Sequence, residues 1–135
     1  MLGLGHRIGL EAPAFYAVFD RDDANHSAAR ETSLLREPAT LLTTNYVLVE
    51  TTALLQHRLG VAAVRSFHED VVPRPQVDRI MEEEHRAGAE AVLTAARKKL
   101  SPVDCVSFQT MWRCGVRTAF CFDAHSSKQG FAARP

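Results

Sequence analysis

Residues 101–123 decide the fold, and they read SPVDCVSFQTMWRCGVRTAFCFD. Ser101 is a helix N-cap, because proline occupies the first helical position and the carboxylate of Asp104 occupies the third. The pattern predicts a helix over residues 102–114, which Gly115 ends. A helix with such clear start and stop signals can be placed without any tertiary information.

A strand follows this helix over residues 116–122 (VRTAFCF), and Asp123 comes directly after it. The same alternation extends toward the N-terminus. Further strands are expected at residues 7–10, 41–43 and near Val77, and helices at residues 12–19, from Asp23 or Asn25 to about Arg36, and at 46–59, 62–72 and 80–100. Short apolar strands between helices predict an α/β domain with a mostly parallel sheet and a high helix content.

The composition is that of one globular domain, which we place over residues 1–135. Apolar residues make up 46% of the chain and charged residues 24%, as in ordinary globular proteins. Sixteen basic and sixteen acidic residues give a net charge of zero. This balance argues against a protein that coats nucleic acid through a broad basic field, because such binding is mostly phosphate neutralisation.

The sequence gives no sign of a membrane or secretory protein. Its apolar runs are shorter than the roughly 18 residues that cross a bilayer, and the N-terminal residues match a signal peptide poorly. Cys105, Cys114 and Cys121 are odd in number and lack C-x-x-C spacing, so they predict neither a zinc site nor a disulfide framework. We therefore expect a cytoplasmic protein.

Glu50 is a carboxylate on an apolar helix face. Its helical neighbours include Tyr46, Val47, Ala53 and Leu54. A carboxylate in such surroundings costs several kcal/mol unless it is paired or metal-bound. Two interpretations remain open, an internal ion pair with an arginine and a functional carboxylate at the edge of a pocket.

Asp104 and Asp123 also have two interpretations each. Asp104 can serve the helix alone, as the third-position carboxylate of a capping box. Asp123 can form a turn, but it follows a strand, and ligand sites form where parallel strands end. Carboxylates that converge without Lys or Arg need a cation. Oxygen ligands favour Mg²⁺ or Mn²⁺, and metal-assisted phosphodiester hydrolysis is the chemistry that fits.

The other motifs of the sequence give little evidence of function. The chain has no P-loop, no G-x-S-x-G and no H-E-x-x-H. Glu82 and His85 form a single Glu-x-x-His, whereas a di-metal bundle needs two copies. We interpret this pair as part of a solvated helix face.

Three stretches resemble the PIN-domain family, and within it the VapC-like ribonucleases of bacterial toxin–antitoxin pairs. They are NYVLVE (residues 45–50), LSPVDCVSF (100–108) and TAFCFDAH (118–125), with AFYA (14–17), DRDDANH (20–26) and GF (130–131) in the same pattern. The resemblance covers roughly residues 11–131, in order and with family-like spacing. It implies a three-layer α/β fold, with a small mostly parallel sheet flanked by helices.

The resemblance also implies an activity. In that family, acidic residues hold Mg²⁺ or Mn²⁺, and the enzyme cuts single-stranded RNA. Glu50, Asp104 and Asp123 match three of the acidic positions, so we predict them as catalytic residues and metal ligands. Ser107 and Asn45 are expected to orient these carboxylates. The resemblance further implies a homodimer and a cognate antitoxin that blocks the acidic site.

The first acidic block departs from the family pattern. The family has Asp, then Thr or Ser, then Ala, whereas this chain has Glu11, with Pro13 in place of the small hydroxyl residue. Glu11 is therefore a provisional fourth metal ligand, and we expect reduced activity in an intact fold. The alternatives are a degenerate PIN domain that binds RNA or protein, and, ranked low, a phospho-receiver domain. The latter requires a lysine at the end of a late strand, which this chain lacks.

Overall fold

The computed structural model describes residues 7–31, 41–95, 101–116, 118–120 and 132–134. Its sheet has five strands in the order β3-β2-β1-β4-β5, and all neighbouring strands are parallel. The strands are β1 (Ile8–Leu10), β2 (Leu41–Thr44), β3 (Gln76–Asp78), β4 (Thr118–Phe120) and β5 (Ala132–Arg134). The first four fall within or next to the predicted strand segments. β5 is not predicted from the sequence pattern.

The helices of the described residues are α1 (Ala12–Phe19), α2 (His26–Arg30), α3 (Asn45–Arg58), α4 (Val61–Ser66), α5 (Glu82–Ala95) and α6 (Pro102–Arg113). Two predicted helices differ from the structure. The segment 62–72 is α-helical only in its first half and continues as a π-helical turn, Phe67–Val71. The segment 80–100 begins as a helix at Glu82, and residues 96–100 lie outside the described ranges, as do the last residues of the predicted second helix.

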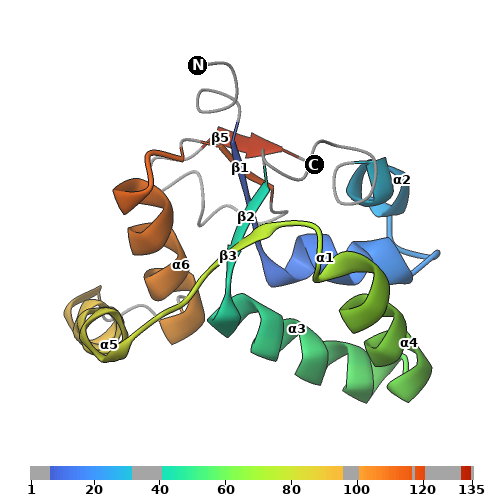
Figure 1. Ribbon diagram of the computed structural model, residues 1–135, viewed down its shortest axis with the longest axis horizontal. Helices are drawn as coiled ribbons and strands as arrows, with labels where there is room; N and C mark the ends of the chain where they lie inside the picture. The colour runs from blue at the N-terminus through green and yellow to red at the C-terminus, as the bar shows by residue number, and fades with distance from the viewer. Residues whose placement is uncertain (1–6, 32–40, 96–100, 117, 121–131, 135) are drawn as a thin grey trace.

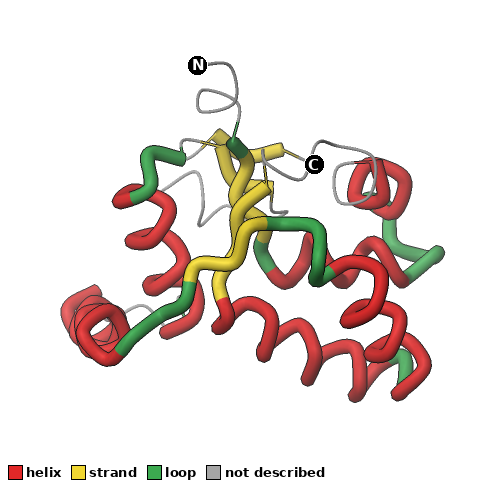
Figure 2. Tube along the Cα trace, viewed as in Figure 1, coloured by secondary structure: helices red, strands yellow, loops and turns green. Residues whose placement is uncertain are grey.

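The sheet lies between two layers of helices, with α5 and α6 on one side and α1, α3 and α4 on the other (Figures 1 and 2). Adjacent side chains on a strand point to opposite faces of the sheet, so Leu41 and Leu42 of β2 face different helical layers. Leu41 packs in a core cluster with Phe15 of α1 and Leu55 of α3, and Leu42 packs with Met111 of α6. The predicted three-layer α/β arrangement is confirmed.

Helix α6 approaches both β1 and α5 at glycines. A Cβ atom built on Gly9 would overlap the side chain of Met111, and one built on Gly88 would overlap the side chain of Val106. The missing side chains therefore allow α6 to pack against the sheet and α5 to pack against α6. This packing places the first turn of α6 beside the start of α3.

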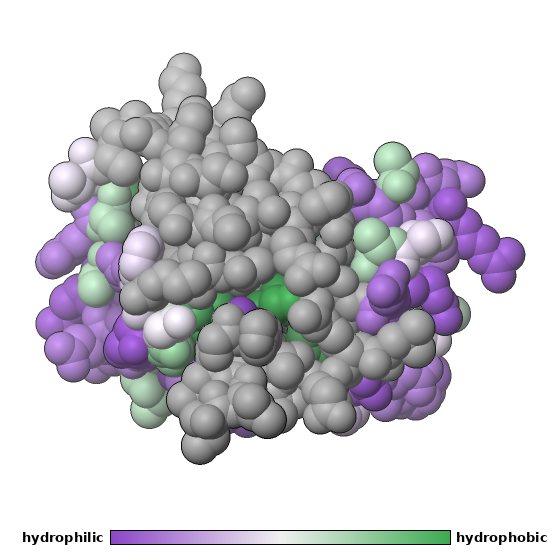
Figure 3. Space-filling view, turned by 90° about the horizontal axis from the view of Figure 1, so that it is seen from above, coloured by the Kyte–Doolittle hydropathy of each residue, from purple (hydrophilic) through white to green (hydrophobic). Residues whose placement is uncertain are grey.

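In the view from above the molecule, the described side chains at both flanks are mainly hydrophilic (Figure 3). None of the helices in the described ranges is both long enough and apolar enough to cross a bilayer. The helices are instead apolar on the faces that cover the sheet, as amphipathic helices of a layered domain are.

Candidate active site

The candidate site forms at the edge where β1 and β2 end. The Oγ1 atom of Thr43 donates a hydrogen bond of 3.0 Å to the carbonyl of Leu10, which ties the two strand ends together. Thr44 caps α3, since its Oγ1 accepts a 3.2 Å hydrogen bond from the backbone N–H of Val47. The two strands therefore deliver Glu11 and the first turn of α3 to the same edge.

Glu11 is the deeply buried carboxylate of this edge. It occupies the N-cap position of α1, but its side chain does not cap that helix, and the residue is only 5% exposed. A cavity of about 10 Å³ lies beside it, about the smallest space that holds one water molecule. The cavity is lined by residues of β1, β2, α3 and α6, namely Leu10, Glu11, Leu42, Thr43, Thr44, Val47, Ser107, Thr110 and Met111.

Ser107 brings a polar group to this cavity from α6. The residue is 2% exposed, and its hydroxyl makes no hydrogen bond to any residue that the structure describes. Buried hydroxyls nearly always have a partner. The cavity therefore has a hydroxyl available for a water molecule or a ligand atom, consistent with the orienting role predicted for Ser107.

Glu50 and Asp104 are brought together from α3 and α6. Burial raises the pKa of Glu50 above its ordinary value, and the negative charge of Asp104 raises it further. The same charge adds to burial in raising the pKa of the Cys105 thiol. Within the described ranges, the salt bridges do not include Glu50, so these residues do not support the internal ion pair. The functional carboxylate stays a prediction.

Asp104 also serves its own helix. The Oγ atom of Ser101 accepts a hydrogen bond of 3.1 Å from the Asp104 N–H, and Oδ2 of Asp104 accepts one of 3.3 Å from the Ser101 N–H. The predicted capping box is therefore confirmed. This box fixes the first turn of α6, and so holds the carboxylate whose charge acts on Glu50.

The complete metal set stays a prediction. Asp123 lies outside the described residues, and among those described no group of three or more His, Cys, Asp or Glu side chains could hold a metal ion. Glu11 is thus not joined to Glu50 and Asp104 in such a group. Glu50 and Asp104, whose charges interact, carry carboxylate oxygens, which fit a hard divalent cation such as Mg²⁺ or Mn²⁺.

Asn45 makes a contact that was not predicted, and its predicted orienting role stays a prediction. Its Oδ1 atom accepts a 2.7 Å hydrogen bond from the backbone N–H of Ile80, so it fixes the approach to α5. In the next residue, the Tyr46 hydroxyl shares a hydrogen bond with Nδ1 of His85. Sequence reasoning missed this pair. The available signal was that Tyr46 lies four residues before Glu50 and therefore on the same side of α3.

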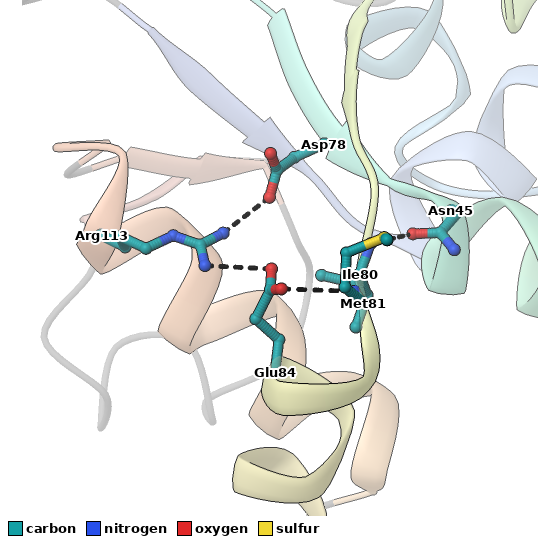
Figure 4. Close-up of polar contacts among 6 residues, drawn as sticks. All are labelled: Asn45, Asp78, Ile80, Met81, Glu84 and Arg113. Carbon is teal, nitrogen blue, oxygen red and sulfur yellow. Dashed lines mark hydrogen bonds and ion pairs between the residues drawn. The ribbon is translucent and has the colours of Figure 1, made fainter.

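Arg113, at the end of α6, forms ion pairs with acidic side chains of β3 and α5 (Figure 4). Its guanidinium lies 2.7 Å from Asp78 at the end of β3 and 3.0 Å from Glu84 in the first turn of α5. Glu84 also accepts a hydrogen bond from the Met81 N–H at 3.3 Å. By contrast, Glu82 pairs with Arg86 on the exposed side of α5, which agrees with the predicted solvated face.

The chain is similar to known proteins both in sequence and in fold. No protein-family model matches the chain. Two curated relatives, both named 23S rRNA-specific endonuclease VapC20, come from the CDC 1551/Oshkosh and ATCC 25618/H37Rv strains of Mycobacterium tuberculosis. Each is 32% identical over 119 residues, which cover 85% of this chain and 88% of the relative. The crystal structure of Mycobacterium tuberculosis VapC20, described as a sarcin–ricin loop cleaving toxin, matches with a TM-score of 0.81 and 27% identity, over 95% of this chain and 99% of that chain.

Proposed function

The chain belongs to the VapC-like branch of the PIN-domain family, and from this membership we propose that it is a toxin-type endoribonuclease, which hydrolyses phosphodiester bonds in RNA. The observation that carries the proposal is that Glu50 of α3 lies near enough to Asp104 of α6 to feel its charge. Burial raises the pKa of Glu50, and the negative charge of Asp104 raises it further, so the folded protein keeps two like charges near each other. Function explains such an arrangement, because stability alone does not favour it.

A divalent cation, Mg²⁺ or Mn²⁺, is part of the proposal. Glu50, Asp104 and Asp123 would hold it, with Glu11 as a provisional fourth ligand. When bound, such a cation lowers the pKa of a water molecule and neutralises charge on the phosphate. The capping box holds the carboxylate of Asp104 in place, and the buried Ser107 hydroxyl offers a hydrogen bond inside the cavity beside Glu11.

For the substrate, we propose 23S rRNA, with the sarcin–ricin loop as the first RNA to test. The support is the names of the relatives, a 23S rRNA-specific endonuclease and a sarcin–ricin loop cleaving toxin. A zero net charge fits an enzyme that recognises one RNA site better than a protein that coats RNA. We further propose that the protein acts in the cytoplasm, that it forms a homodimer, and that a cognate antitoxin inhibits it.

The second candidate function is a degenerate PIN domain that binds RNA or protein without cutting it. The observation that favours it is Glu11, which replaces the aspartate of the family pattern and is 5% exposed. Glutamate is one methylene longer than aspartate, whereas productive catalytic geometries tolerate about 0.5 Å of misplacement. The two candidates differ in one measurable result, the cleavage of RNA.

The test is a cleavage assay on a sarcin–ricin loop RNA and on intact ribosomes, with Mg²⁺, Mn²⁺ or EDTA. We expect site-specific cleavage with a divalent cation, reduced by about 100-fold or more in Glu50→Gln and in Asp104→Asn, since even outer-shell partners of a metal are worth about 10–100-fold. The matched control is Glu83→Gln, which removes an exposed carboxylate from α5. Binding of RNA without cleavage under every condition would support the degenerate module instead.

A further inference from the structure

Tyr46 and His85 form an aromatic pair on the surface, between α3 and α5. Their ring centroids lie 5.8 Å apart at an interplanar angle of 71°, and the Tyr46 hydroxyl shares a hydrogen bond with Nδ1 of His85. Tyr46 is partly exposed and His85 is exposed. Both rings therefore have surface available to a ligand. The Nε2 edge of His85 makes no hydrogen bond to a described residue.

Tyr46 of this pair lies on the same side of α3 as Glu50. Val47, Thr51 and Leu55 form the buried stripe of α3, and Tyr46 and Glu50 lie together beside it, one helical turn apart. Tyr46 contacts α5 through His85, and Glu50 senses the charge of Asp104 on α6. Since α5 and α6 pack against each other at Gly88, the aromatic pair and the acidic pair are carried by three helices that are in contact.

Other contacts attach the start of α5 to the domain (Figure 4). Asn45 holds the backbone of Ile80, and Arg113 holds Glu84, the residue before His85. The attachment of α5 therefore has several contacts of its own, besides the close packing at Gly88. The Tyr46–His85 contact is not needed to join α5 to the domain, and another role fits an exposed aromatic pair better.

We propose that Tyr46 and His85 form a nucleobase-binding surface, on which a base next to the cleaved phosphodiester stacks. The inference rests on the proposed ribonuclease function and adds a substrate contact to it. Proteins that bind single-stranded nucleic acid stack bases on tyrosine and histidine rings. The base would lie on the Tyr46 ring, with His85 keeping that ring in position through their hydrogen bond.

The experiment measures cleavage and binding separately. Cleavage of a sarcin–ricin loop RNA by the full-length protein gives kcat and KM. Binding of the same fluorescein-labelled RNA is measured in a Glu50→Gln background, which needs no cleavage. The variants are Tyr46→Ala, Tyr46→Phe and His85→Ala, and the matched control is His57→Ala, which removes an exposed histidine from the far end of α3.

We expect Tyr46→Ala to weaken RNA binding by about 10-fold, within the range of roughly 5- to 150-fold that follows from the stacking of one base. The loss should appear mainly in KM, and Tyr46→Phe should recover most of it because it keeps the ring. His85→Ala should cause a smaller loss. Replacing the stacked base by an abasic site should weaken binding to the unsubstituted protein equally, and should remove the difference between Tyr46→Ala and that protein.

The other outcomes separate a failure of the inference from a failure of the ribonuclease function. If the RNA is cut and Tyr46→Ala behaves like His57→Ala, the inference is wrong and the ribonuclease function stands. If the RNA is bound but not cut, the ribonuclease function fails, and the binding data alone decide on the aromatic pair. If no RNA is bound or cut, both fail. Should Tyr46→Ala unfold, an abasic scan with the unsubstituted protein that finds no sensitive position would overturn the proposal.

Discussion

Asp104 of α6 lies close enough to Glu50 of α3 for its negative charge to add to burial in raising the pKa of Glu50. The two residues are far apart in the sequence, and each is placed by local signals of its own. Thr44 caps the helix that carries Glu50, and Ser101 caps the helix that carries Asp104. Two helices with caps of their own thus carry two negative charges that interact. The first two predictions below test how these charges affect stability and metal binding.

The first prediction concerns Glu50 in the metal-free protein. A carboxyl group whose pKa is raised by folding favours the folded state at low pH, and this contribution is lost as the pH rises above the ordinary value of 4.5. We therefore expect Glu50→Gln to raise the Tm in EDTA at pH 7–8 by about 1–3 °C, a modest effect because Glu50 is only partly buried. Near pH 4, Glu50→Gln and the unsubstituted protein should have the same Tm. Equal Tm values at both pH values would contradict the raised pKa.

The second prediction concerns the cation. Binding of Mg²⁺ or Mn²⁺ between carboxylates relieves their repulsion, and a ligand at 100 times its Kd adds about 2.7 kcal/mol to stability. We expect either metal to raise the Tm, and Glu50→Gln and Asp104→Asn each to weaken that rise. The control is Glu83→Gln, which should keep the full rise. If a metal titration gives identical thermal shifts in all four proteins, these carboxylates do not hold the cation.

The third prediction concerns the altered first acidic block. Mg²⁺ requires near-ideal octahedral geometry, so the longer side chain of Glu11 should leave an activity that prefers Mn²⁺. Restoring the family pattern with Glu11→Asp and Pro13→Ser should raise RNA cleavage and reduce this preference. The comparison is an RNA digest in each metal, with Asp104→Asn as the inactive control. A folded, metal-binding double variant that cuts no better than this control would favour the binding module.

The fourth prediction concerns the packing of α5 on α6. Alanine normally stabilises a helix relative to glycine, but a Cβ at residue 88 would overlap the side chain of Val106. We expect Gly88→Ala to destabilise the protein by about 1–3 kcal/mol, the usual cost of overpacking. Chemical denaturation measures the effect. Val106→Ala combined with Gly88→Ala should recover part of the loss, whereas a stabilised single variant would show that the helices separate without cost.

The sequence alone determined the elements whose signals are local. Ser101, the proline after it and Gly115 mark the two ends of α6, and the apolar run at residues 41–43 marks β2. Strands that alternate with helices then predict a parallel sheet between two helical layers. The reason is that two neighbouring parallel strands must be joined by a crossover segment, which is usually a helix. The strand β5 lacked such a signal: it is short, and it exists through its pairing with β4, a contact between distant residues.

Only the tertiary structure decided which side chains meet. The sequence identified Glu50 and Asp104 as candidates, but the effect of the Asp104 charge on the pKa of Glu50, which adds to that of burial, depends on how α3 and α6 pack. In the same way, the hydrogen bond from the Ile80 N–H to the side chain of Asn45 depends on where the segment before α5 lies. The partnership of Tyr46 with His85 depends on where α5 lies. Helical periodicity fixes the face on which a residue lies, whereas its partner comes from another element, and that choice is made by packing over the whole domain.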